Sequence, residues 1–313
     1  RSLSRRSLRD TKNSSSEVLL LDRNFRVLHR SKIVGGRCVQ GRSRVVDGRL
    51  FATNGGEELW LSHANMWGNR RCPAGQHVLA RIALNADGIA RLVNTSHQAG
   101  VGLAGLPGTN LTSVRNGGVL ISPSGHGSPT HELVDAGPGL ELRTPRGDIL
   151  RPNVPRTFAI PGLHNSIHPL WVPELGAYLG VAHRHLRTGE HSKRGDDPPF
   201  VFGYSYRHVL FTLVPIRGSS SSPSYSLGRH SREFCLPSLQ ALRADVTKGH
   251  VARAPTTSKL FAEQPCEGVQ FVMSAFRPVA DNASVSFSYG VQDCEAAMFT
   301  LTLPTIVALL EFA

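Results

Sequence analysis

The sequence has no long apolar run, and no stretch comes near the roughly 20 apolar residues that a membrane-spanning helix needs. Its five cysteines include no Cys-x-x-Cys pair, which argues against a zinc ribbon or a thioredoxin-like redox motif. P-loop, dinucleotide-binding and Gly-x-Ser-x-Gly motifs are absent as well. These absences exclude a membrane-embedded protein, and neither coiled-coil heptads nor a collagen repeat is present.

Turn-forming residues, by contrast, are abundant. Glycine (31) and proline (20) make up about a sixth of the 313 residues, which favours many turns and short strands over long helices. Residues 1–16 are basic and serine-rich without apolar periodicity, so we expect a solvated tail or stem there. From Glu17 onward the pattern predicts an all-β fold, with hairpins at 17–28 and at Asp47-Gly48 within 45–55.

A weak internal repeat organises the rest of the chain. A turn followed by two β-runs recurs four times, at 47–53 with 77–84, 116–122 with 131–136, 175–183 with 208–215, and 282–293 with 294–304. Such a repeat predicts a β-propeller, and the N-terminal hairpin brings the expected number of blades to five. We expect one propeller over 17–313, with inserted loops near 187–199 and 217–265 and a low-complexity loop at 217–232. Residues 300–312 predict a closing strand or a short helix, and a β-sandwich with a chance repeat is the alternative fold.

Four Asn-x-Ser/Thr sequons bear on where the protein is made. They begin at Asn13, Asn94, Asn110 and Asn282, and such sequons mark glycosylated surface loops of secreted proteins, although several would also arise by chance. The last three are the predicted acceptors. Because the chain starts at Arg1 without a methionine or an apolar signal segment, we expect a processed product or a fragment. The predicted location is the secretory pathway, in the Golgi lumen, or the extracellular space.

The odd number of cysteines leaves at least one thiol unpaired. We predict a disulfide between Cys235 and Cys266, because it would join the ends of a 30-residue insertion and limit the disorder of that loop. Such a bond requires an oxidising compartment. Cys294 lies among apolar strand residues, so we expect it to be buried and free.

Five segments of the second half of the chain share a distinctive pattern. They are 164–185 (HNSIHPLWVPELGAYLGVAHRH), 204–215 (YSYRHVLFTLVP), 233–238 (EFCLPS), 266–276 (CEGVQFVMSAF) and 285–301 (VSFSYGVQDCEAAMFTL), with YSYRH and SYG-x-x-DCEA the most specific parts. Through these segments the chain resembles a group of five-bladed propellers. The group is similar in plan to mannoside-phosphorylase-like glycoside hydrolases, and its members occur alone or beside glycosyltransferases. The resemblance covers roughly 40–302, most specifically 160–302, and implies a glycan or glycoprotein substrate and a glycosyltransferase as a candidate partner.

The sequence departs from this group at the acid catalyst. Related active propellers carry a Glu-Asp-Pro-Arg type motif before the first Asp-Gly hairpin, whereas residues 41–44 here are Gly-Arg-Ser-Arg, which retains only Arg44. Glycoside cleavage needs two carboxylates about 5–10 Å apart, one as acid and one as base or nucleophile. Glu267 and Asp293 are the candidate catalytic pair. As structural residues, Glu267 would instead pair with an arginine and Asp293 would cap a turn.

Polar residues at the starts of inner strands are the candidate binding residues. They are Arg44, Asn165, Ser166, His183, Tyr206 and His208. Because equivalent strands of all blades converge on the axis of a propeller, we expect Arg44, Asn165, Ser166, His183, Glu267 and Asp293 to meet around one central channel. A histidine beside Tyr206 and Arg207 would suit an anionic ligand, since arginine offers a planar fork to carboxylate, phosphate or sulfate. No carboxylate spacing strengthens a metal site among His164, His183 and His208, so we expect neither a metal nor a cofactor.

Two functions remain open at this level. One is glycan processing by a hydrolase- or phosphorylase-like propeller that uses Glu267 and Asp293. The other is a non-catalytic glycan-binding or scaffolding propeller that has lost its catalytic acids, and the net charge of +12 would suit an acidic or sulfated glycan. Nucleic-acid binding is disfavoured, because the arginines are scattered and no RNA-binding motif occurs.

Overall fold

In the computed structural model most of the described residues lie in strands, which confirms the all-β prediction. The structure describes residues 17–21, 27–35, 46–53, 57–65, 76–84, 90–93, 118–121, 123, 131–135, 141–143, 149–150, 163–187, 204–216, 224–236, 269–278, 281–291 and 295–310. The chain divides into two compact units, 1–115 and 116–313, and each is described by itself. No helix among the described residues is both long enough and apolar enough to cross a membrane.

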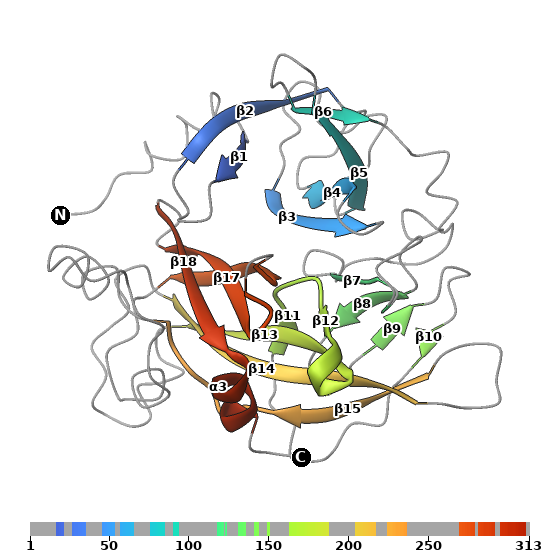
Figure 1. Ribbon diagram of the computed structural model, residues 1–313, viewed down its shortest axis with the longest axis vertical. Helices are drawn as coiled ribbons and strands as arrows, with labels where there is room; N and C mark the ends of the chain where they lie inside the picture. Colours follow the sequence, from blue (N-terminus) through green and yellow to red (C-terminus); the bar gives the residue numbers. More distant parts are fainter. Residues whose placement is uncertain are drawn as a thin grey trace, which may run out of the picture. The chain divides into compact units, whose positions relative to one another are not determined.

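The described strands of the first unit form one six-stranded sheet (Figure 1). Its strands, in the order β1-β2-β6-β5-β4-β3, are β1 (Glu17–Leu21), β2 (Val27–Gly35), β6 (Ala90–Val93), β5 (Gln76–Leu84), β4 (Glu58–Asn65) and β3 (Val46–Thr53). Strands β3 to β6 form an antiparallel meander, and β2 joins it by parallel pairing with β6. The predicted hairpin at 17–28 is present as the pairing of β1 with β2.

The hairpin predicted at Asp47-Gly48 is wrong. Both residues lie inside the single strand β3, where the register with β4 shifts between Val46 and Arg49. The extra residues are accommodated by this bulge, a local irregularity that glycine tolerates within a strand. The chain instead reverses after Thr53, which pairs with Glu58 at the start of β4.

The described strands of the second unit form three sheets. The β7–β10 sheet is a meander of β7 (Gly118–Leu120), β8 (His131–Asp135), β9 (Glu141–Arg143) and β10 (Ile149–Leu150). The central sheet contains β11 (Leu163–Asn165), β12 (Leu170–Val172), β13 (Ala177–Arg187), β14 (Tyr204–Ile216) and β15 (Ser224–His230), with the 3-10 helix η5 (Pro173–Leu175) between β12 and β13. The β16–β18 sheet contains β16 (Gln270–Phe276), β17 (Ser284–Val291) and β18 (Glu295–Thr302), and α3 (Leu303–Leu309) follows it.

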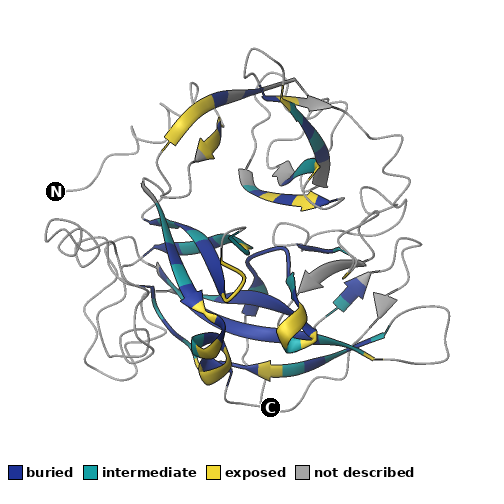
Figure 2. Ribbon diagram, viewed as in Figure 1, coloured by how far each residue is buried: buried dark blue, intermediate teal, exposed yellow. Residues whose placement is uncertain are grey.

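The central sheet is packed on both faces. Leu179 and Val181 of β13 belong to the hydrophobic core shared with the β16–β18 sheet and α3, whereas Tyr178 and Ala182 belong to the core shared with the β7–β10 sheet. This alternation follows from the two-residue period of a strand. Since both faces are covered, β13 and β14 are buried along their middle sections (Figure 2).

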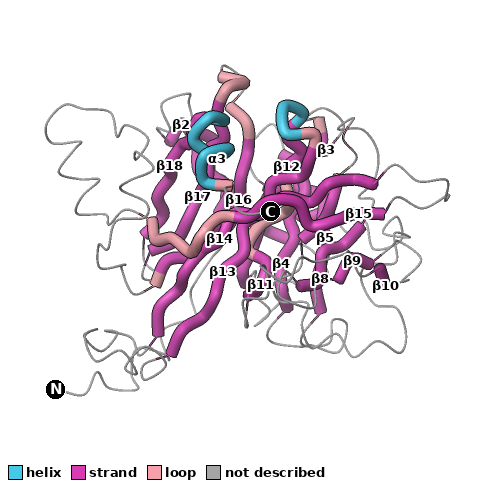
Figure 3. Tube along the Cα trace, turned by 90° about the horizontal axis from the view of Figure 1, so that it is seen from below, coloured by secondary structure: helices cyan, strands magenta, loops and turns pink. Residues whose placement is uncertain are grey.

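Two chain segments differ from the sequence-based expectation. Residues 224–230, expected inside a low-complexity loop, form β15, because Tyr225 and Leu227 alternate with polar residues and both side chains enter the core. Residues 300–312 were expected to be a strand or a helix, and both occur. The chain ends β18 at Thr302 and continues directly into α3, with Pro304 in the first turn and Thr302 as the N-cap (Figure 3).

Candidate functional site

The predicted binding residues of the second unit meet on the central sheet. His183 of β13 is the register partner of His164 on β11 and of His208 on β14, so three histidines form one row across the sheet. The chain stays beside β13 after β11 ends, because the Ser166 amide donates a hydrogen bond of 2.8 Å to the Val181 carbonyl. Asn165, Ser166, His183 and His208, predicted from separate motifs, therefore lie in one part of the molecule.

His183 is the best-connected member of this row. Its Nδ1 lies 2.8 Å from the Ser166 hydroxyl, and both side chains are buried. Its ring contacts Phe271 edge-on, with centroids 4.8 Å apart, and Tyr206 with centroids 5.4 Å apart. The ring centroid of His164, on β11 at the opposite edge of β13 from Tyr206, lies 5.8 Å from that of His183. Ser166 therefore fixes the ring orientation of His183 within an aromatic environment.

These contacts form a histidine–aromatic cluster between the central sheet and the start of β16. We define it as His164, His183, His185, Tyr206 and Phe271. All members except His183 are half-buried. Phe271 was missed by sequence reasoning because it stands in an apolar strand like an ordinary core residue. The available signal was its position, four residues after Glu267.

His208 differs from its neighbours because it is fully buried and neither ring nitrogen has a hydrogen-bond partner among the residues that the structure describes. Its ring packs against Phe234, with centroids 5.9 Å apart. Burial lowers the pKa of His208 to about 3, and the charge of Arg207 contributes in the same direction. The imidazole is thus neutral at physiological pH, held in the sheet by packing rather than by polar contacts.

Asn165 and His168 connect the central sheet to β7. The Asn165 amide donates to the Ile167 carbonyl at 2.8 Å, and His168 Nδ1 accepts a hydrogen bond of 2.8 Å from the Val119 amide. A Cβ atom at Gly118 would lie 2.6 Å from the Ile167 carbonyl oxygen. Glycine is required there because the two backbones approach each other so closely.

The side chains around Cys235 form a second polar group. Arg207 Nη1 donates to Cys235 Sγ at 2.6 Å, and Arg184 forms an ion pair of 2.6 Å with Glu233. Arg207, expected to suit an anionic ligand, therefore contacts Cys235. Cys235 is disulfide-bonded. Its predicted partner Cys266 lies outside the described residues, so that pairing stays a prediction.

The remaining predicted site residues lie outside the described part of the chain. They are the catalytic candidates Glu267 and Asp293, the binding candidate Arg44, and the sequons at Asn94 and Asn110. The nearest described positions to the two acids are Gln270 and Val291, which are register partners of β16 and β17. Among the described residues, no group of histidine, cysteine, aspartate and glutamate side chains could hold a metal ion.

Comparisons with known proteins identify no relative of this chain. No protein-family model, no curated protein sequence and no solved structure matches it. The functional conclusion therefore rests on the residues and contacts described above.

Proposed function

We propose that this protein is a carbohydrate-active five-bladed β-propeller of the secretory pathway that binds and processes a glycan at a site in its central channel. The observation that carries the proposal is the histidine–aromatic cluster. It joins the end of β13 to the starts of β14 and β16, and in the sequence Glu267 precedes β16 by three residues while Asp293 follows β17 by two.

The sheet connectivity supports a propeller. The strand groups β3–β6, β7–β10 and β16–β18 each run as an antiparallel meander in chain order, as the strands of a blade do. In the central sheet β13, β14 and β15 do the same, and the short strands β11 and β12 both pair with β13. All eight segments of the sequence repeat contain or overlap strands. The central sheet is packed face to face between two others, which is how a blade contacts its neighbours. We assign the fifth blade to the β1–β2 hairpin, which is tied to β6 by only three parallel register pairs.

The chemistry of the cluster suits a sugar ring. Sugars present apolar C–H faces that pack on aromatic rings, and hydroxyl groups that need hydrogen-bond partners. Tyr206 and Phe271, with centroids 6.0 Å apart, supply half-buried aromatic surface. His164 and His185 supply imidazole nitrogens beside it, which can donate or accept according to their protonation. Such a combination of apolar surface and few polar groups is typical of small-ligand sites.

Few residues along the chain separate the two candidate acids from Gln270 and Val291, the register pair next to Phe271 of the cluster. Glu267 precedes Gln270 by three residues and Asp293 follows Val291 by two, so extended chain would separate them from that register pair by at most about 11 Å and 7 Å. Phe271 is the next residue after Gln270. Two carboxylates in this neighbourhood would satisfy the need of glycoside cleavage for one protonated acid and one ionised base or nucleophile. The disulfide bond of Cys235 favours an oxidising compartment.

The alternative function is glycan binding or scaffolding without turnover. The cluster itself contains no carboxylate, so binding there does not require an acid. The Gly-Arg-Ser-Arg sequence at 41–44 lacks the acids of the related active propellers. The basic net charge of +12 would favour an anionic glycan under either function.

Three variants separate these functions when turnover of an oligosaccharide panel and binding to a glycan array are measured together. Phe271→Ala should weaken glycan binding by about tenfold or more, equivalent to about 1.4 kcal/mol. Phe276→Ala, on the same strand but away from the cluster, is the matched control and should leave binding unchanged. Asp293→Asn should lower turnover by at least about 100-fold while binding is retained.

The wild-type protein then decides between the two candidates. Binding without turnover on every panel member would establish the non-catalytic function. Absence of both binding and turnover would overturn the carbohydrate proposal. Equal binding by Phe271→Ala and Phe276→Ala would place the site elsewhere.

A further inference from the structure

The turn between β16 and β17 carries the sequon Asn282-Ala283-Ser284. We propose that Asn282 carries an N-linked glycan, and that the glycan is attached to the unfolded chain before β17 is incorporated into its sheet. This inference rests on the secretory-pathway location in the proposed function, but it concerns what is attached to the protein and is independent of any glycan on which the protein acts.

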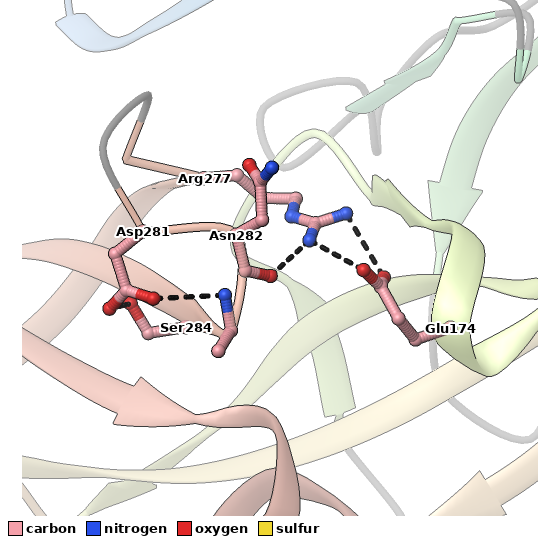
Figure 4. Close-up of polar contacts among 6 residues, drawn as sticks. Glu174, Arg277, Asp281, Asn282 and Ser284 are labelled. Atoms are coloured by element: carbon pink, nitrogen blue, oxygen red, sulfur yellow. Dashed lines mark hydrogen bonds and ion pairs between the residues drawn. The ribbon is translucent and has the colours of Figure 1, made fainter.

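Asn282 is accessible in the folded protein. It lies in an exposed turn with Asp281 and Ala283, and its side-chain amide has no hydrogen-bond partner in the described part of the chain. Its backbone carbonyl accepts a hydrogen bond from Arg277, which also makes a bidentate ion pair with Glu174 at 2.7 and 3.0 Å (Figure 4). The turn backbone is therefore held in place while the Asn282 amide points away from the Glu174 and Asp281 carboxylates.

Ser284, the third residue of the sequon, is engaged in the fold. Its hydroxyl donates to Asp281 Oδ2 at 2.6 Å, and the Ala283 amide donates to Asp281 Oδ1 at 2.9 Å. The hydrogen bond from Ser284 holds the pKa of the Asp281 carboxyl below its usual range, so the acceptor stays ionised. Ser284 is 1% exposed and is the first residue of β17, paired with Thr302.

This geometry fixes the order of modification and folding. A glycosyl-transferring enzyme must recognise the hydroxyl two residues after the acceptor asparagine. In the folded turn that hydroxyl is buried and committed to Asp281, so the enzyme cannot reach it. In the unfolded chain the same hydroxyl is free. The glycan is thus added first, and the folded turn then presents Asn282 on the surface.

The transfer needs only a donor sugar with a good leaving group, here an oligosaccharide linked to a lipid diphosphate. Nδ2 of Asn282 attacks C1 of the first sugar, and a C1–N bond forms as the bond between C1 and the phosphate oxygen breaks. The lipid diphosphate leaves with the bonding electron pair, and Nδ2 loses one proton to a base of the enzyme. No oxidation or reduction occurs.

The position of the turn is compatible with the proposed binding site. Strand β16 runs from Gln270 beside the histidine–aromatic cluster to Phe276 beside the turn, and seven strand residues span roughly 20–23 Å. A glycan on Asn282 therefore leaves the opposite end of the sheet, to which Phe271 belongs, uncovered. Asn282→Gln should accordingly alter glycosylation without altering ligand binding.

The proposal is tested by expressing the full chain behind a secretion signal in eukaryotic cells. Enzymatic removal of N-glycans in ¹⁸O-water converts glycosylated asparagine to labelled aspartate, which peptide mass spectrometry locates. We expect label at position 282 in the wild type, in Asp281→Ala and in Ser284→Thr. We expect none in Asn282→Gln or Ser284→Ala. Because the glycan is added to the nascent chain, the label at position 282 can be measured even in variants that fold poorly. An unlabelled 282 peptide from wild-type chain would overturn the proposal.

The order of events needs a second measurement. Unglycosylated chain made in bacteria is offered, folded or reduced and unfolded, to microsomal glycosyl-transferring enzyme with a lipid-linked donor. Modification at Asn282 of the unfolded sample alone is the expected result. Equal modification of the folded sample would overturn the claim that folding closes the sequon. Neither assay involves glycan binding or turnover, so their outcome is independent of the glycan-binding and glycan-processing parts of the proposed function.

Discussion

At the residue scale, two neighbouring histidines in one sheet have opposite polar environments. His183 is buried but its Nδ1 is hydrogen-bonded to Ser166, whereas its register partner His208 has no polar partner at either nitrogen within the described part of the chain. An unpaired polar group costs free energy on burial, and a charged one costs far more. The fold therefore tolerates His208 only in its neutral form.

This environment makes the free energy of unfolding depend on pH. The native pKa of His208 is about 3, below the ordinary histidine value of 6.5. Between these values the unfolded chain binds a proton that the native protein excludes, so stability is lost as pH falls from about 6.5 toward 3. The slope contributed by one proton is at most about 1.4 kcal/mol per pH unit. His208→Phe should remove this contribution, so the free energy of unfolding of the variant should fall less steeply as the pH is lowered.

Urea unfolding at a series of pH values between 7 and about 4 measures the effect, provided that the transition is two-state. The informative quantity is the difference between wild type and His208→Phe, because other titrating groups then cancel. We expect that difference to change steadily in favour of the variant as pH falls. Parallel curves for the two proteins would show that His208 does not contribute to acid sensitivity.

At the element scale, α3 is stabilised by contact with the sheet rather than by its own length. A seven-residue helix is too short to be stable alone. Leu303, Ile306 and Leu309 face the core shared by the central and β16–β18 sheets, and the Thr302 hydroxyl accepts a hydrogen bond of 3.3 Å from the Thr305 amide. The helix is therefore a cover for this core, with its other side exposed at Val307.

Paired substitutions in α3 test this role. Ile306→Ala removes a fully buried side chain and should lower the free energy of unfolding by about 2–5 kcal/mol. Val307→Ala, on the neighbouring residue of the same helix, removes a side chain that is 41% exposed and should change stability by less than about 1 kcal/mol. Urea midpoints of the two variants at neutral pH give the comparison. Similar midpoints would mean that α3 is not docked as described.

Local sequence patterns predicted most strands but failed where tertiary context decides. The repeat segments fall on strands because alternation of apolar residues is a local signal. Asp47-Gly48 carries the same local signal as a hairpin turn, yet pairing with β4 keeps it within β3. The strand at 224–230 was not predicted because its serines resemble those of the neighbouring low-complexity loop, although Tyr225 and Leu227 have the two-residue spacing of one strand face.

The candidate site was accessible to sequence reasoning only in part. Ser166, His183 and His208 were chosen from motif segments far apart in the chain, and the pairing of β11, β13 and β14 brings them together. A histidine with a hydrogen-bond partner cannot be distinguished from one without by sequence alone, because the difference depends on which side chains cover each face of the sheet. Phe271 could not be separated from core residues, since its contact with His183 arises from the packing of two sheets.

At the scale of the whole molecule, the net positive charge and the histidine–aromatic cluster should contribute separately to ligand binding. The chain carries 35 lysines and arginines against 23 acidic residues. Several arginines are used in ion pairs, including Arg81 with Glu58, Arg184 with Glu233 and Arg277 with Glu174. The excess of +12 is a property of the whole chain and attracts any polyanion, an attraction that salt screens within about 10 Å at 0.1 M ionic strength. Recognition by the histidine–aromatic cluster depends on apolar contact and short hydrogen bonds, which salt weakens much less.

Elution from a sulfated-polysaccharide column therefore reports a different quantity from binding to a glycan array. Phe271→Ala changes no charge, so it should elute at the same salt concentration as the wild type while losing array binding by about tenfold or more. An arginine-to-glutamine change outside the cluster, such as Arg91→Gln on β6, should do the reverse and elute slightly earlier with unchanged array binding at moderate salt. If Phe271→Ala instead elutes earlier and Arg91→Gln loses array binding, the apparent glycan recognition is surface electrostatics. The cluster would then have no binding role.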